Sequence, residues 1–268
     1  MSQAKFTAKV AMPEALHAEW TKLRTLSSTL WLVLAATVLT VAVSAGAVFA
    51  STYQSIGHQD TTRLSLTGID LGQAIIAIFA VLVMSNEYST GMMRLTLTAM
   101  PRRLLVLAAK ATTLTGIMVT SGVTAVGGCL VAGRLILPVR GFTASHDYPL
   151  LSLVHGATLR AASGSVLYLA LIALLSLGVA AAVRDSAVSI GIVLGLLYLF
   201  PLLAQAVNDP TWHRHLEQVG PMTAGLAIQA TTGLQDLPIS PWAGLGVLAG
   251  WAGAALAVGG LLLHRRDA

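Results

Sequence analysis

The chain has 268 residues, of which 55% are hydrophobic and 10% are charged, and its mean hydropathy is +0.76. A soluble domain carries roughly 25% charged residues, so this composition excludes an ordinary soluble protein and predicts a chain surrounded by lipid. The net charge of +5 does not indicate nucleic-acid binding, because no basic stripe with interleaved aromatic residues accompanies it.

Residues 13–28 predict an amphipathic helix that lies in the membrane interface. Leu16, Trp20 and Leu23 recur at helical spacing, and charged residues lie off this stripe. The first long apolar run starts at Leu30 and has 21 residues. It exceeds the roughly 7–15-residue core of a signal peptide, so we expect it to be retained as a membrane span.

Six segments are long enough to cross a bilayer as helices, which takes roughly 20 residues each. Five contain long uncharged runs, and the second in chain order carries Asp70 near its start. The predicted fold class is an all-α integral membrane protein, a single domain with six transmembrane helices. The expected spans cover residues 30–50, 66–84, 104–133, 161–183, 186–207 and 242–263.

Lysine and arginine predict the orientation of these spans. With six spans both termini share one side, and that side carries 11 basic residues against 5 on the other, so it is expected to be cytoplasmic. The acidic residues divide 5 to 6 and do not influence the choice. The 11 are Lys5, Lys9, Lys22, Arg24, Arg94, Arg102, Arg103, Lys110, Arg184, Arg265 and Arg266, and the 5 are Arg63, Arg134, Arg140, Arg160 and Arg214.

The outer segment 208–240 is partly apolar but too short to span. Apolar stretches of roughly 10–14 residues are often re-entrant or interfacial, so short outer re-entrant helices are expected before the last span. Two GxxxG pairs, Gly191–Gly195 and Gly246–Gly250, favour tight packing within the subunit, with a dimer seam as the alternative.

Few residues in this sequence indicate catalysis or metal binding. There is no GxxxxGK[ST] and no HExxH. His213 and His215 lack obvious further metal ligands, and Ser163 in "AASGS" lacks a base within a later span, so it is interpreted as a helix-packing residue. Cys129 is alone and is also interpreted as a packing residue.

Asp70 and Gln73 are the candidate residues of a transport pathway. An acid within a span is costly and often functional. Asp70 is also about one turn from the outer end of its span, so it can equally reach water. Both interpretations stay open.

The segment "SNEYSTGMMRLTLTAMPRRLLVLAAK", residues 85–110, predicts a short amphipathic cytoplasmic helix over 87–100. Glu87 is expected near its N-terminus, where a negative charge is favoured, and Pro101 is expected to end it. Tyr88, Met92, Leu95 and Ala99 fall on one face; Thr90, Arg94 and Thr98 fall on another. The residues alone allow either a helix that docks a partner or a charged interfacial loop.

Four stretches of the sequence resemble the permease subunits of type-2 ATP-binding-cassette exporters. They are "AEWTKLRTLSSTLW", "NEYSTGMMRLTLTAMPRRLLVLAAK", "RDSAVSIGIVLGLLYLFPLL" and "LLHRRDA". The second matches an E-x-x-x-G-T pattern followed by Pro, Arg and Lys, with methionine in place of the usual threonine at position 92. Its matching residues are Glu87, Gly91, Pro101, Arg103 and Lys110. The resemblance covers essentially the whole chain.

The resemblance implies a bacterial plasma-membrane permease with both termini cytoplasmic, paired with an identical second copy or a paralogue. A separate ATP-binding subunit would hold ATP and magnesium, so this chain would have no catalytic residues and bind no cofactor itself. Membrane lipid is the other expected partner, and nucleic acid is not expected. Segment 208–240 would form the extracellular gate. The implied first contact with the ATP-binding subunit is a coupling helix with Glu87, Tyr88, Thr90, Gly91, Arg94, Thr98 and Pro101; the second is the turn Arg184, Asp185 and Ser186.

The expected function is therefore the outward transport of a hydrophobic or amphiphilic substrate, since the spans offer few charges to a polar one. The alternatives are a secondary transporter or channel that works without an ATPase, and an intramembrane enzyme. The first should carry charges or broken helices at mid-depth, and the second should show a nucleophile with a base or a metal cluster.

Overall fold

The computed structural model describes residues 13–22, 27–52, 59–99, 103–143, 146, 148, 151–152 and 155–265. Within these ranges the regular elements are all helical. A helix at residues 13–22 precedes α2 (Ser27–Ala50), α3 (Thr61–Ser65), α4 (Ile69–Ser89), α5 (Met92–Ala99), α6 (Arg103–Ile136), η1 (Pro138–Arg140), α7 (Gly156–Val183), α8 (Ser186–Ala206), α9 (Pro210–Val219), α10 (Pro221–Leu226), η3 (Ala227–Gln229) and α11 (Pro241–Arg265).

Six of these helices, α2, α4, α6, α7, α8 and α11, are long and apolar enough to cross a membrane. They coincide with the six predicted spans, although several run further than expected. Helix α4 continues past residue 84 to Ser89, and α7 begins at Gly156 rather than at 161. At the N-terminus, residues 27 and 28 belong to α2 instead of the interface helix, and residues 23–26 lie outside the described residues.

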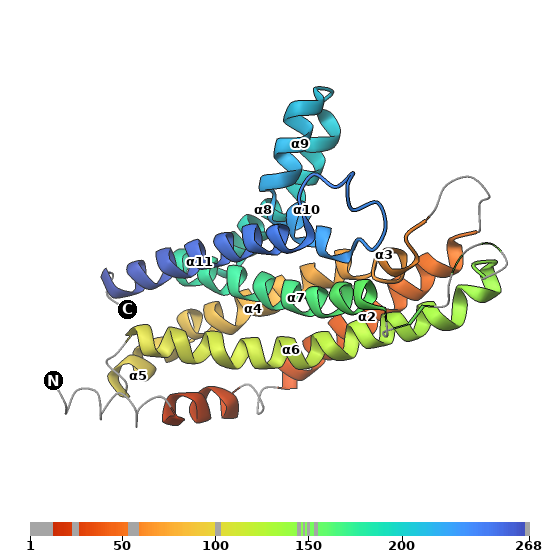
Figure 1. Cartoon of the computed structure of the whole chain (residues 1–268). Coiled ribbons are helices and arrows are strands. Elements are labelled where there is room, and N and C mark those ends of the chain that lie inside the picture. The colour runs from red at the N-terminus through yellow and green to blue at the C-terminus, as the bar shows by residue number, and fades with distance from the viewer. Residues whose placement is uncertain are drawn as a thin grey trace.

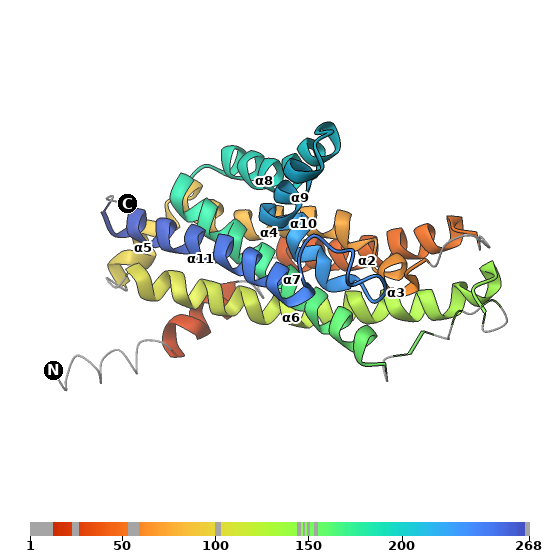
Figure 2. The ribbon, with the colours of Figure 1, turned by 45° about the horizontal axis from the view of Figure 1, so that its top comes forward.

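Helix α7 lies in the middle of the bundle, between α4, α6 and α11 (Figures 1 and 2). Of the residues in its most hydrophobic stretch, 67% are buried, against 22% in the corresponding stretches of α2 and α8. Glycine allows the α7 and α11 backbones to touch: a Cβ on Gly178 would lie 2.5 Å from the backbone of Ala255, and one on Gly259 would lie 2.6 Å from the Gly178 carbonyl oxygen. This contact fixes the centre of the bundle.

The GxxxG glycines do not serve this purpose. A Cβ placed on Gly191, Gly195, Gly246 or Gly250 would meet nothing within 4 Å. Their interpretation as close-packing positions within the subunit is therefore wrong, because both pairs lie on open faces of α8 and α11.

The helices meet at two ends of the bundle. The end that we call the α5 end holds α5, the start of α6 and α8, and the last turns of α4, α7 and α11 (Figure 1). The opposite end, called the α3 end, holds α3 and the loop after η3, which are joined through Asp60.

Short helices occupy segment 208–240, as predicted, and they differ in how they pack against the bundle. Helix α9 has no buried residue and stands clear of the bundle (Figure 1). Helix α10 and η3 are buried against α7 and α11, with Ala224 and Ile228 inaccessible to solvent. Their depth in the membrane stays a prediction.

Candidate functional site

Four charged side chains meet at the α5 end and form what we call the ion cluster: Glu19, Lys22, Glu87 and Lys110. The Lys110 ammonium lies 2.7 Å from Glu19 Oε2 and 2.7 Å from Glu87 Oε1. The Lys22 ammonium lies 3.1 Å from Glu19 Oε1 and 3.0 Å from Glu87 Oε1. Each lysine therefore bridges both carboxylates.

The ion cluster is largely shielded from water. Lys110 is 1% exposed, Glu19 4% and Glu87 7%. Buried charges lose several kcal/mol of hydration each, and their mutual attraction offsets this only when the pairing is complete. Here two positive charges face two negative ones, and Glu87 Oε2 alone among the four carboxylate oxygens is buried without a hydrogen-bond partner. Burial disfavours the charged form of Lys22, but the carboxylates of Glu19 and Glu87 outweigh burial and raise its pKa.

The ion cluster connects four separate elements. Glu19 and Lys22 come from helix 13–22, Glu87 from α4 and Lys110 from α6. Lys22 also donates a hydrogen bond to Thr96 Oγ1 of α5, over 3.3 Å. The N-terminal helix, α5 and two long spans are thus fastened at one point.

The expected position of Glu87 in the first turn of the coupling helix is wrong. Helix α4 continues to Ser89, and Gly91, with φ 70°, separates it from α5. Glycine suits this left-handed conformation because it has no Cβ. Glu87 therefore lies in the last turn of α4, where the helix dipole disfavours a carboxylate. Its ion pairs with Lys22 and Lys110 offset this unfavourable interaction.

Helix α5 nevertheless presents an accessible surface. Met92 is 41% and Leu95 71% exposed, whereas Met93 is buried. Thr90 and Thr98 are also exposed, and their hydroxyls donate to the carbonyl oxygens of Asn86 and Leu95. The side chains of Arg94 and Ala99, and the whole of Pro101, lie outside the described residues.

The turn between α7 and α8 joins the same end. Ser186 Oγ donates to Ser85 Oγ of α4 over 2.8 Å. The Arg184 guanidinium lies over the half-buried Tyr88 ring, 5.3 Å from its centroid, and Asp185 caps α8 by accepting from Val188 N. The two predicted coupling segments are therefore connected through the end of α4.

The candidate pathway residues belong to a polar network among α4, α7 and α8. Gln73 is fully buried and accepts a hydrogen bond from the Tyr168 hydroxyl. Tyr198 donates to the Asp70 carbonyl oxygen over 2.6 Å, and Gln73 Nε2 donates to the same oxygen over 3.1 Å. This network holds three spans together. The side chain of Asp70 is half-buried in the first turn of α4.

The other residues considered from the sequence lie elsewhere. Ser163 donates to the Leu159 carbonyl oxygen of its own helix, and Cys129 is buried. His213 contacts the Ala204 carbonyl oxygen and lies 3.5 Å from Glu217. In the part of the chain that the structure describes, no three His, Cys, Asp or Glu residues gather as metal ligands would.

Sequence reasoning missed three members of the ion cluster as partners of Glu87. A signal existed for Lys110, a lone charge in the first turns of a span, because an intramembrane charge usually has a partner. Glu19 and Lys22 gave a weaker signal, since charges on an amphipathic helix ordinarily face water. Tyr168 and Tyr198 were also missed, although a buried tyrosine hydroxyl usually finds a hydrogen-bond partner.

Six candidate membrane spans and a charged junction at one end define a multi-pass membrane protein. The family model described as ABC-2 family transporter protein matches residues 15–202. This range begins in helix 13–22, includes the whole ion cluster and ends within α8. The chain therefore belongs to the ABC-2 transporter family and is a membrane component of such a transporter. No curated protein matches it.

Proposed function

We propose that the protein is the permease subunit of an ATP-binding-cassette exporter in the bacterial plasma membrane. A separate ATP-binding subunit hydrolyses ATP with magnesium, and two permeases, identical or paralogous, form the membrane core. The α5 end and both termini face the cytoplasm. Family membership supports this assignment, as does the excess of lysine and arginine on the side that carries α5.

The observation that carries the proposal is the ion cluster. When an ATPase moves an exposed helix, the spans move with that helix only if it is firmly attached to them. Helix α5 is linked through Lys22 to Glu19 and Glu87, and Lys110 ties both carboxylates to α6. Movement of α5 is thereby delivered to α4, α6 and helix 13–22 together.

The contact surface for the ATP-binding subunit consists of α5 and the turn 184–186. Leu95 and Met92 supply its apolar part, and Thr90 and Thr98 supply its rim. Glu87 acts from behind this surface, since its carboxylate is turned inward to the two lysines. Tyr88 and Arg184 connect the two contact segments.

The transported substrate is hydrophobic or amphiphilic and moves outward. The six spans carry few charges that could replace the hydration shell of a polar solute, whose transfer into apolar surroundings costs several kcal/mol. Segment 208–240 forms the outer gate, with α10 and η3 packed on α7 and α11.

The test is the ATPase activity of the purified complex in lipid vesicles, measured against a panel of solutes. We expect stimulation by hydrophobic and amphiphilic compounds, and none by sugars or inorganic ions. Stimulation only by hydrophilic solutes would overturn the substrate class. Transport by the chain in the absence of any ATP-binding subunit would instead identify a secondary transporter or channel.

A further inference from the structure

A groove of about 520 Å³ opens on the side of the bundle between helix 13–22, α2 and α6. Its walls come from residues 30–37 of α2 and 116–124 of α6, and Trp20 of helix 13–22 also lines it. Both long helices are candidate membrane spans, so the groove faces the hydrocarbon of the bilayer. It is separate from the ion cluster and from the network around Gln73.

The groove is built for an apolar occupant. None of its lining residues is charged. The hydroxyls of Thr37, Thr120 and Thr124 each donate to a carbonyl oxygen of their own helix, over 2.9, 2.9 and 2.7 Å. A polar group that entered would leave water and find no free donor among these hydroxyls, which is unfavourable.

The dimensions and lining of the groove suit an alkyl chain. At 1.5 Å per residue, its α6 wall is about 12 Å long, which is close to the roughly 15 Å depth of one hydrocarbon leaflet. An alkyl chain carries no polar group, so it requires no hydrogen bond from the engaged hydroxyls of the lining.

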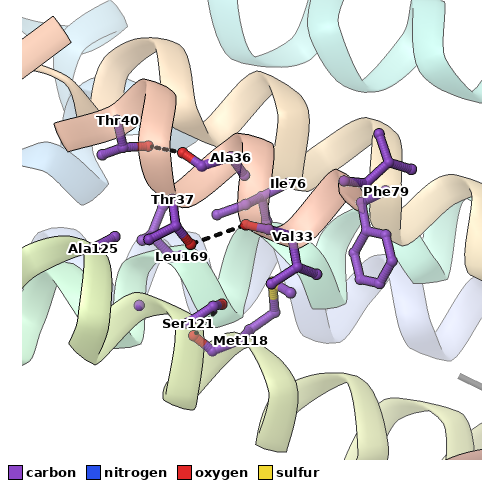
Figure 3. Close-up of a pocket in the computed structure, with 12 residues that line it drawn as sticks. Val33, Ala36, Thr37, Thr40, Ile76, Phe79, Met118, Ser121, Ala125 and Leu169 are labelled. Atoms are coloured by element: carbon purple, nitrogen blue, oxygen red, sulfur yellow. Dashed lines mark hydrogen bonds between the residues drawn. The ribbon is translucent and has the colours of Figure 1, made fainter. Parts of the chain in front are cut away.

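The groove borders the core of the bundle. Directly behind Val33, Thr37 and Ser121 lies a small void of about 10 Å³, which is also lined by Phe79 and Leu169 (Figure 3). Ser121 donates to the Met118 carbonyl oxygen, so its hydroxyl is already engaged. The groove therefore lies directly over the packed core of the bundle, in which Phe79 and Leu169 are buried.

From these features we propose that the groove binds one acyl chain of a phospholipid from the leaflet at the α5 end. Trp20, which is 50% exposed, also lines the groove, and tryptophan favours the membrane–water boundary. Its neighbour Glu19 points into the ion cluster. A bound chain therefore holds helix 13–22 from one side while the ion cluster holds it from the other.

The test uses the full-length chain in lipid nanodiscs that contain phosphatidylcholine with a photoactivatable diazirine in the middle of one acyl chain. After illumination, labelled peptides are quantified by mass spectrometry. We expect residues 30–37 and 116–124 to carry at least threefold more label than residues 246–253 of α11, another open membrane-facing surface. The measurement needs no ATP-binding subunit, so it succeeds or fails independently of the proposed function.

Two glycines of α6 provide a matched pair of variants. A Cβ at Gly116, which lines the groove, or at Gly127, which does not, would meet nothing within 4 Å. We expect Gly116→Leu to reduce labelling of the groove to the α11 level and Gly127→Leu to leave it unchanged. Equal labelling of all membrane-facing segments, unchanged labelling in Gly116→Leu, or cross-links from the groove to a second copy would each overturn the proposal.

Discussion

The two ends of the bundle are held together by different chemistry. At the α5 end, four charged side chains pair in a water-shielded cluster that joins helix 13–22, α4, α5 and α6. At the α3 end, the Asp60 carboxylate accepts hydrogen bonds from Thr231 N, Thr231 Oγ1 and Thr232 N, and from Arg63 N. Arg160 adds one bond to the Ala230 carbonyl oxygen.

This difference has a mechanical consequence. Buried ion pairs leave an uncompensated charge when they separate, so the elements they join move together. The hydrogen bonds that the partly exposed Asp60 carboxylate accepts from the loop can be replaced by bonds to water, so separation of the loop leaves no charge without a partner. We therefore expect the elements at the α5 end to separate less readily than the loop at the α3 end.

The largest expected effect follows from removing the central charge of the ion cluster. Lys110→Met leaves the buried carboxylates of Glu19 and Glu87 with only Lys22 between them. We expect a loss of about 3–5 kcal/mol of stability, measured by thermal unfolding in nanodiscs. Wild-type stability in this variant would show that the ion cluster does not hold the junction.

Removing one opposite charge as well should restore most of that stability. In Glu87→Leu with Lys110→Met, the Glu19–Lys22 pair remains balanced, and replacing a buried pair by apolar side chains is often neutral. We expect the double variant to unfold within about 1 kcal/mol of wild type, while its ATPase activity no longer responds to substrate. A double variant less stable than Lys110→Met alone would contradict the pairing.

A smaller effect is expected at the α3 end. Asp60→Ala removes the bonds to Thr231 and Thr232, and we expect limited proteolysis of the loop 230–240 to accelerate severalfold while the midpoint of unfolding shifts little. Asp236→Ala, in the same loop, is the control. Equal protection of the loop in wild type and Asp60→Ala would show that Asp60 does not hold the loop in place.

The smallest effect is expected for Lys22, whose side chain is 25% exposed. Water reaches part of the Lys22 site and can partly replace its charge at the two carboxylates, so Lys22→Met should destabilise less than Lys110→Met. Because its pKa is raised in the folded state, its contribution is complete below the ordinary lysine pKa of 10.5. The contribution is lost as pH rises through the raised value. Stability differences between wild type and Lys22→Met should therefore be constant from pH 6 to 9 and shrink only in stronger alkali.

The number and order of the spans were predictable because each is a long apolar run that only a helix can carry across lipid. The exact ends were not, since α4 passes through the polar residues Ser85–Ser89 to complete the ion cluster. Sequence patterns also predicted a short helix near residues 87–100. They could not show that Glu87 turns inward, because its partners at positions 19, 22 and 110 are brought together only by the tertiary fold.

The GxxxG pairs also show that a sequence pattern does not identify the partner in a tertiary contact. A pattern of small residues indicates that a close approach is possible, and it does not say which helix approaches. Between α7 and α11, the close contact is made by Gly178 and Gly259, which belong to neither pair.

The proposed contact between α5 and an ATP-binding subunit can be tested directly. The measurement is co-purification of such a subunit with the tagged chain from native membranes, for wild type, Leu95→Asp and Val139→Asp. Leu95 is 71% exposed on α5, and Val139 is 81% exposed in η1, near the α3 end of the bundle. We predict that an ATP-binding subunit accompanies wild type and Val139→Asp and is lost from Leu95→Asp. Recovery of the chain alone in all three cases, or equal recovery of the subunit with Leu95→Asp, would contradict the assignment of α5 as the coupling helix.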